Sequence, residues 1–238
     1  MKNIIDEFRD LLRTVSPLMV TLMVLSIVGM NLLANKSIDT GVEWLALDGG
    51  ILLSWLTFLS MDVLTQCYGP RASTMLSVVA LLINLMMALI FFIASQIPGV
   101  WGESFVPGSE NVINTALDNT FGGTWFIILG SSIAFMVSSV VNNFMNYGIG
   151  KALNRDMSFG TFALRSYVST FIGQFTDNLV FALLVSRMFF GWAMIQCITC
   201  AFTGAIMELV FEIFFSPIGY RISRGILDGR PAAELQKA

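Results

Sequence analysis

Four acidic side chains lie within long apolar stretches of the sequence, where charged groups are rare. They are Asp62, Asp177, Glu208 and Glu212. A charge at the centre of a bilayer costs roughly 2.5–3.5 kcal/mol on insertion scales, so such a residue normally has a partner or a function. Glu208 and Glu212 are four residues apart and share one helix face, where they could hold a proton between them. Grouped inside a membrane, the acids predict a binding site for a transported solute.

Carboxamide side chains accompany these acids at helical spacing. Each lies three or four residues from another polar residue, which puts both on one face of a helix. Segment 139–146 also resembles segment 170–177 at an offset of 31 residues, and internal repeats around a midplane site are frequent in transporters. The alternative is that these amides only bond across helices, as Asn and Gln often do in membrane bundles. The amides are Gln66, Asn143, Asn146 and Gln174.

Membrane-spanning helices must position these residues, and the composition predicts such helices. The chain of 238 residues is 55% hydrophobic and 12% charged, whereas a soluble domain carries roughly 25% charged residues. Apolar stretches of about 20 residues cross a bilayer as helices. We therefore expect an all-α membrane protein, with a single domain of six transmembrane helices over residues 15–220. The predicted spans are 15–34, 44–66, 72–97, 118–151, 159–186 and 192–218, the last ending at Pro217.

The segments between and beyond the spans set the expected orientation. Residues 1–14 mix charges with apolar residues at helical spacing, which predicts an amphipathic helix on the membrane surface. Residues 98–120 read as a polar, acidic loop, and residues 221–238 as a basic cytoplasmic tail. Placing both chain ends inside puts eleven of the 13 basic residues there, leaving only Lys36 and Arg187 outside. We expect an N-in, C-in protein of the bacterial cytoplasmic membrane, with Arg165 reaching the membrane surface from near a span end.

Several classes of function are disfavoured by composition. A net charge of −3 argues against nucleic-acid binding, which needs a clustered basic face. With no histidine, zinc-protease and Ser–His chemistry are excluded. Cys197 and Cys200 form a lone C-x-x-C, interpreted as apolar filling, so no metal site and no cofactor is predicted. Two-aspartate proteolysis through Asp62 and Asp177 stays open, although no Gly-x-Gly-Asp segment supports it. The expected partners are the lipid bilayer and a small molecule, and a homodimer stays open.

The end of the second span resembles a known signature. It reads Asp62-Val-Leu-Thr-Gln-Cys-Tyr-Gly69, similar to the Asp-x-x-Thr-Glu-x-Tyr-Gly motif of the queuosine precursor transporter (VUT) family, with Gln66 in place of the glutamate. Segments 165–177 and 208–220 also resemble later helices of that family. The resemblance covers residues 45–220 in order.

This resemblance implies a fold and a substrate. The fold would be similar to the six-helix substrate-binding subunits of energy-coupling-factor vitamin transporters. The function would be import of 7-deazaguanine bases, purine-like precursors of queuosine, without an ATPase partner. A vitamin-binding subunit of such a transporter and an intramembrane enzyme are the alternatives. Carried over to this chain, the substrate-binding residues would be Asp62, Gln66, Tyr68, Asn143, Asn146, Gln174 and Asp177, with Glu208 and Glu212 close by.

Overall fold

The computed structural model describes residues 4–38, 41–42, 47–101, 107–108, 110–122, 125–153, 158–189 and 191–229, and the regular structure in them is helical apart from one short hairpin. The hairpin pairs β1 (Ser37–Ile38) with β2 (Leu47–Asp48) in antiparallel register. The helices are α1 (Ile4–Thr14), α2 (Pro17–Leu33), α3 (Ile51–Tyr68), α4 (Pro70–Gln96), α5 (Glu110–Gly122), α6 (Trp125–Ala152), α7 (Phe159–Phe181), α8 (Arg187–Phe189) and α9 (Met194–Asp228), with a π-helical turn over Ala182–Ser186.

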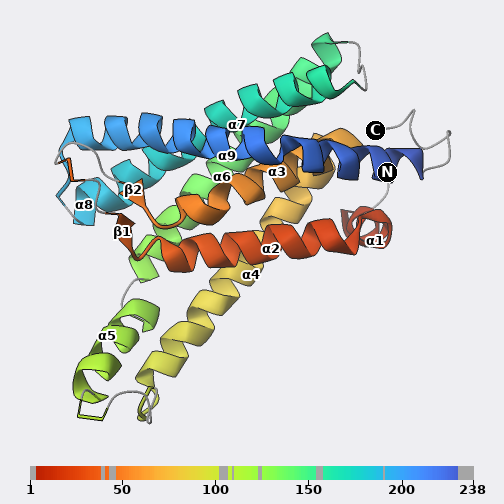
Figure 1. Cartoon of the computed structure of the whole chain (residues 1–238). Coiled ribbons are helices and arrows are strands. Elements are labelled where there is room, and N and C mark those ends of the chain that lie inside the picture. Colours follow the sequence, from red (N-terminus) through yellow and green to blue (C-terminus); the bar gives the residue numbers. More distant parts are fainter. Residues whose placement is uncertain are drawn as a thin grey trace.

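The long helices alternate in direction along one bundle. α2, α4 and α7 run away from the end that carries α1, and α3, α6 and α9 run back towards it (Figure 1). In the described part of the chain, five segments are long and apolar enough to span a membrane: α3, α4, α5 with α6, α7 with the π turn, and α9. The bent pair of α1 and α2 is the candidate for a sixth. The prediction of a helical, multi-pass membrane protein is therefore confirmed.

The first helices meet at a sharp bend. The axes of Phe8–Thr14 and Pro17–Leu33 differ by 105°, so α1 lies across the end of the bundle (Figure 1). Tyr68 at the end of α3 stabilises this bend, because its hydroxyl accepts from the Ser16 amide and donates to the Thr14 carbonyl, both at 3.2 Å. Proline suits the first turn of a helix, where its missing N–H is not needed, and α2 begins accordingly at Pro17. Contact of α1 with a membrane surface stays a prediction.

A glycine and a proline separate α3 from α4. Gly69 has φ +86°, in the region that glycine tolerates best, and its amide donates to the Thr65 carbonyl at 3.0 Å. Pro70 then opens α4 with a φ preset for a helix. The second span was predicted to begin at residue 44, but α3 begins at Ile51. Residues 47–48 instead form β2, which pairs with β1. Residues 43–46 lie outside the described part of the chain.

The segment predicted as a polar loop over residues 98–120 contains helix α5, so that prediction was wrong. Aromatic contacts hold α5 against the end of α4: the Trp101 and Phe121 rings stack at 5.2 Å, and Phe91 meets Phe121 at 5.1 Å. The Trp101 indole N–H also donates to Asp118 at 2.7 Å. The polar residues of α5 lower its mean hydropathy, so the segment was predicted as a loop instead of a helix.

The last helix does not end at Pro217, contrary to prediction, but continues to Asp228. Proline removes the amide that would bond the carbonyl four residues earlier, that of Ile213. The Ser216 hydroxyl donates to this carbonyl at 3.1 Å and also contacts the Tyr167 hydroxyl at 2.7 Å. A serine therefore replaces the missing amide, as happens for prolines in membrane helices. The first eight residues of the predicted tail are helical.

Candidate functional site

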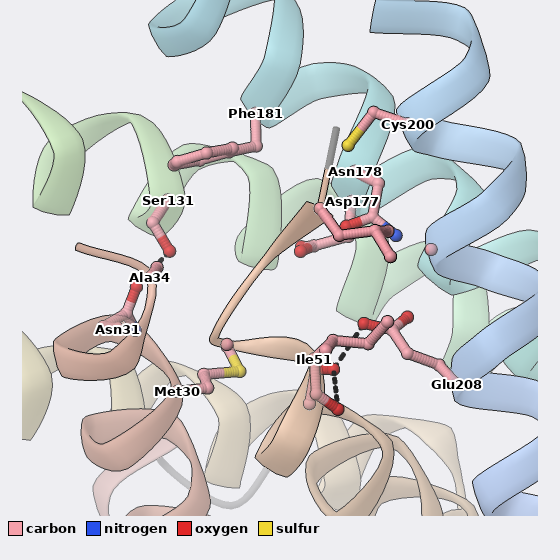
Figure 2. A pocket seen from close by; sticks show the side chains of 14 residues that line it. Met30, Asn31, Ala34, Ile51, Ser131, Asp177, Asn178, Phe181, Cys200 and Glu208 are labelled. Carbon is pink, nitrogen blue, oxygen red and sulfur yellow. Dashed lines mark hydrogen bonds between the residues drawn. The ribbon is translucent and has the colours of Figure 1, made fainter. Parts of the chain in front are cut away.

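A polar pocket opens in the bundle near the β1–β2 hairpin, between α2, α3, α6, α7 and α9. The cavity volume is about 40 Å³, and the pocket is open to solvent on one side. Figure 2 shows Asp177 and Asn178 of α7 and Glu208 of α9 on one side of it, and Asn31 of α2 and Ser131 of α6 on the other. The polar residues that line it are Asn31, Ser54, Ser131, Asp177, Asn178 and Glu208, and the apolar ones include Met30, Phe181 and Cys200.

Two carboxylates reach this pocket from different helices. Asp177 on α7 accepts a hydrogen bond from the Ser138 hydroxyl of α6 at 2.7 Å. Glu208 on α9 is 2% exposed and accepts from the Ser54 hydroxyl of α3. Each acid is thus held in place by a serine of a neighbouring helix. Because hydrogen bonds to a charged group are the stronger ones, these serines fix the direction in which the carboxylates point.

An asparagine beside these acids presents a donor that the protein does not use. The side-chain nitrogen of Asn178 is buried and has no hydrogen-bond partner among the described residues. It is packed against Gly204 of α9, where an added Cβ would lie only 2.6 Å from that nitrogen. Buried amide nitrogens are normally paired, so an unpaired one that lines a pocket marks a place where a ligand or water accepts a bond.

A second polar cluster lies deeper in the bundle around Asp62, which is fully buried on α3. Its carboxylate accepts from Asn142 of α6 at 2.8 Å and from the Ser166 hydroxyl of α7 at 2.6 Å. The hydroxyls of Ser169 and Thr170 also donate to it, at 3.2–3.3 Å. Asp62 therefore does not line the pocket, and the protein itself supplies its donors.

Gln174 lies between the pocket and this deeper cluster. It is fully buried on α7, one turn from Thr170 and one turn from Asn178. Neither its amide oxygen nor its amide nitrogen has a partner within the described residues. An amide with all its groups unpaired is costly in a low-dielectric interior, so this position too is typical of one that a ligand or an ordered water completes.

Comparison with protein families now identifies the chain. The family model described as "Putative vitamin uptake transporter" matches residues 48–222. The chain belongs to this family. Membership of the vitamin uptake transporter family agrees with the apolar helices that are long enough to span a membrane. The protein is a multi-pass membrane transporter of a small molecule. No curated protein and no solved structure matches the chain significantly.

The other predicted site residues of the transporter lie away from its pocket. Asn143 bonds Thr65, Ser73 and Thr74 at 2.9–3.1 Å, so it joins α6 to α3 and α4. Asn146 donates to Ser169 at 3.3 Å, Tyr68 stabilises the α1–α2 bend, and Gln66 is partly buried at the end of α3. For Asn143 and Tyr68, the contacts are those of residues that bond across helices.

The two segments of the internal repeat lie on neighbouring helices, α6 and α7. Ser138 contacts Asp177 and Asn146 contacts Ser169, so α6 and α7 pack antiparallel. With this register, segments 139–146 and 170–177 lie side by side over their whole length. Asn143 and Gln174 lie at similar depths, but Asn143 bonds α3 and α4 whereas the Gln174 amide has no partner among the described residues.

The side chain of Arg165 lies inside the helix bundle. Its side chain is 6% exposed and donates to the carbonyl and side-chain oxygens of Asn146, at 3.2 and 2.9 Å. Gly150 makes room for it, because an added Cβ there would lie 2.4 Å from the guanidinium carbon. Arg165 therefore places a buried positive charge in the polar interior of the transporter.

Of the lining residues, reasoning from the sequence singled out only Asp177 and Glu208; the polar ones that it missed are Asn31, Ser54, Ser131 and Asn178. Asn178 adjoins Asp177 and could have been included for that reason alone. Ser54 precedes the signature by two turns, at a spacing that puts it on the same face of α3 as Asp62. Asn31 lies in a span with no acid, so no signal in the sequence distinguishes it from a residue that bonds between helices.

Proposed function

We propose that this transporter imports purine-like bases, with 7-deazaguanines, the precursors of queuosine, as the substrate class. The observation that carries the proposal is the arrangement of Asp177, Asn178 and Glu208 around one pocket with an aromatic side chain, Phe181, in its wall. A solute with two adjacent N–H groups and a carbonyl on a flat ring matches this set of donors and acceptors.

The chemistry of recognition follows from the groups that line the pocket. A carboxylate accepts two parallel N–H bonds, which the guanidine-like edge of a deazaguanine offers. The unpaired nitrogen of Asn178 is positioned to donate to the carbonyl of the base. The Phe181 ring supplies an apolar face for stacking on the flat ligand. In this arrangement Asp177 or Glu208 carries the main part of the selectivity, because an analogue that lacks the N–H pair forms fewer hydrogen bonds to the carboxylate.

The setting we propose is a bacterial cytoplasmic membrane, with both chain ends inside and the pocket towards the outer side. The distribution of basic residues supports this orientation, since α1 and the end of α9 lie at one end of the bundle and the hairpin at the other (Figure 1). The amphipathic α1 would then lie on the inner surface. We further propose one domain, a fold similar to energy-coupling-factor substrate subunits, and uptake by this chain without an ATPase partner.

A vitamin is the second candidate substrate, and the description of the family favours it. The same pocket would accept a flat vitamin with adjacent donor groups. In that case the chain would be the substrate-binding subunit of an energy-coupling-factor transporter and would need an ATPase partner for uptake.

An intramembrane aspartic protease is disfavoured by geometry. Such enzymes need two carboxyls about 3 Å apart that share one proton. Asp62 is bonded by Thr170 of α7, whereas Asp177 lies seven residues further along the same helix, about 10 Å at 1.5 Å per residue. We therefore propose that the chain is a transporter and not an enzyme.

The test is ligand-dependent thermal stability of the purified protein. The panel contains queuine, its two deazaguanine precursors, guanine and several vitamins. A ligand that binds only the folded state stabilises it by about 2.7 kcal/mol at 100 times its dissociation constant. We expect a shift with the deazaguanines that is lost in Asp177→Asn and kept in Asp118→Asn, a control whose carboxylate lies on α5 outside the pocket. A thermal shift with vitamins alone would contradict the deazaguanine proposal and support a vitamin as the substrate.

A further inference from the structure

One hydroxyl group bridges two buried carboxyl groups beneath the pocket. The Ser166 oxygen lies 2.6 Å from Asp62 and also within hydrogen-bond distance of Glu212 on α9. Both acids are fully buried. Two carboxyls from different helices, α3 and α9, therefore meet at a single serine of α7.

The number of hydrogen atoms available at this bridge shows that one of the two carboxyl groups must be protonated. A serine hydroxyl has one hydrogen and can donate to only one acceptor. If both acids were ionised, one of the two contacts would place two acceptor oxygens together with no hydrogen between them. A proton on one carboxyl removes the conflict, because that carboxyl then donates to Ser166 while Ser166 donates to the other.

The surrounding donors indicate which acid carries the proton. Asp62 receives bonds from Asn142, Ser166, Ser169 and Thr170, the set that an ionised carboxylate needs. The second oxygen of Glu212 is buried and has no hydrogen-bond partner in the described part of the chain. An unbonded oxygen is far less costly on a neutral acid than on an anion. Glu212 is therefore the protonated member of the pair.

Charged and titratable groups on the neighbouring helices are few. On α7, Arg165 bonds Asn146 of α6, Tyr167 bonds Ser216 of α9, and Asp177 lies at the pocket. On α9, Glu208 lies one turn from Glu212. The part of α6 that faces the pair presents neutral side chains, and α2 has no titratable residue. One buried cation near two carboxyls balances one negative charge, which agrees with one proton on the pair.

The pair is linked to the solute pocket along two helices. On α9, one helical turn separates Glu212 from Glu208, which lines the pocket. On α7, the unpaired amide of Gln174 lies between Thr170, which bonds Asp62, and the pocket residues Asp177 and Asn178. A change of charge at the pair therefore acts on the groups that hold the solute, over one or two helical turns.

We propose that Glu212, bridged to Asp62 by Ser166, is a proton-binding site, and that its proton is the ion that drives solute uptake. Intramembrane acids serve as such relays in proton-coupled transporters. One proton binds the pair from the side on which the pocket opens, and one proton is released to the other side with each solute. The second half of the proposal rests on the proposed transport function.

The first half is tested without any solute, by infrared difference spectroscopy of the whole protein in lipid nanodiscs. We expect the absorption of a protonated carboxyl at neutral pH in the wild type, lost in Glu212→Gln. It is kept in Asp177→Asn and in Asp118→Asn, because those acids lie outside the bridge. If Glu212→Gln does not fold, Ser166→Ala serves instead and is expected to shift the band. A band that neither variant changes, or no band at all, overturns the assignment.

The second half is tested in proteoliposomes with a radiolabelled 7-deazaguanine as the probe. Tenfold accumulation and one pH unit correspond to the same free energy, about 1.4 kcal/mol. A symporter that moves one proton with each base therefore accumulates the base about tenfold inside liposomes whose interior is about one pH unit more alkaline. Uptake that stops at equal concentrations whatever the pH gradient overturns proton coupling and leaves the proposed function intact. If no base binds, the infrared result still decides the proton site, and the failure belongs to the proposed substrate.

Discussion

The bridge formed by Ser166 gives a prediction about stability that does not depend on any ligand. Ser166→Ala removes a fully buried hydroxyl that contacts Asp62 and Glu212 on two other helices. A hydrogen bond between helices in a membrane protein is worth about 0.6 kcal/mol on average and up to about 1.7 kcal/mol. Bonds to charged groups reach about 1.5–3 kcal/mol. Two such contacts predict a loss of about 2–3 kcal/mol in the free energy of unfolding.

The chain offers a matched control on α3. Ser60 is 1% exposed, and its hydroxyl has no hydrogen-bond partner within the described residues. Ser60→Ala deletes the same atom from an equally buried position without breaking a bond, so stability is expected to stay the same or rise slightly. Unfolding by sodium dodecyl sulfate in mixed micelles, followed by tryptophan fluorescence, measures both variants against the wild type. Equal stability of the two variants would contradict this prediction, because burial alone would then account for any change.

Three further predictions concern other parts of the structure. Gly204→Ala is expected to weaken solute binding about tenfold, because its Cβ displaces Asn178 and one hydrogen bond of about 1.4 kcal/mol is lost. Gly148→Ala is the control: nothing lies within 4 Å of its Cβ, so the dissociation constant is expected to stay unchanged. Ser216→Ala lowers stability by about 1 kcal/mol in the same unfolding assay, and adding Pro217→Ala restores part of it, since the new amide can bond the exposed carbonyl. Tyr68→Phe lowers stability by about 1 kcal/mol through loss of the α1–α2 contacts without changing solute affinity, whereas a weaker affinity would place this tyrosine at the ligand.

The spanning helices could be predicted from the sequence because hydropathy over about 20 residues reports directly on the lipid environment. The errors fall where that signal is weak or ambiguous. Helix α5 mixes polar and apolar residues and is held by contacts of Trp101 that no local pattern contains. Pro217 reads as a helix end, yet a neighbouring serine supplies the missing bond. In both cases a tertiary or side-chain contact overrides the local signal.

The sequence predicts which acidic residues lie in the polar interior, but not how they are arranged in space. Asp62, Asp177, Glu208 and Glu212 were all singled out by the cost of burying charge, and all of them face polar partners from other helices. Their division into a pocket and a deeper cluster depends on the register between helices. That register is set by side-chain packing over long sequence separations, as between Asp62 and Ser166, and helical spacing within one segment says nothing about it.

In the function that we propose, this chain alone transports a purine-like base through a pocket built around Asp177. The most direct test is uptake of a radiolabelled 7-deazaguanine into liposomes that contain the purified protein and no ATPase. We expect saturable uptake that is inhibited by unlabelled guanine analogues and abolished in Asp177→Asn. Absence of uptake by the wild type, or uptake that requires added ATPase subunits and ATP, would contradict it.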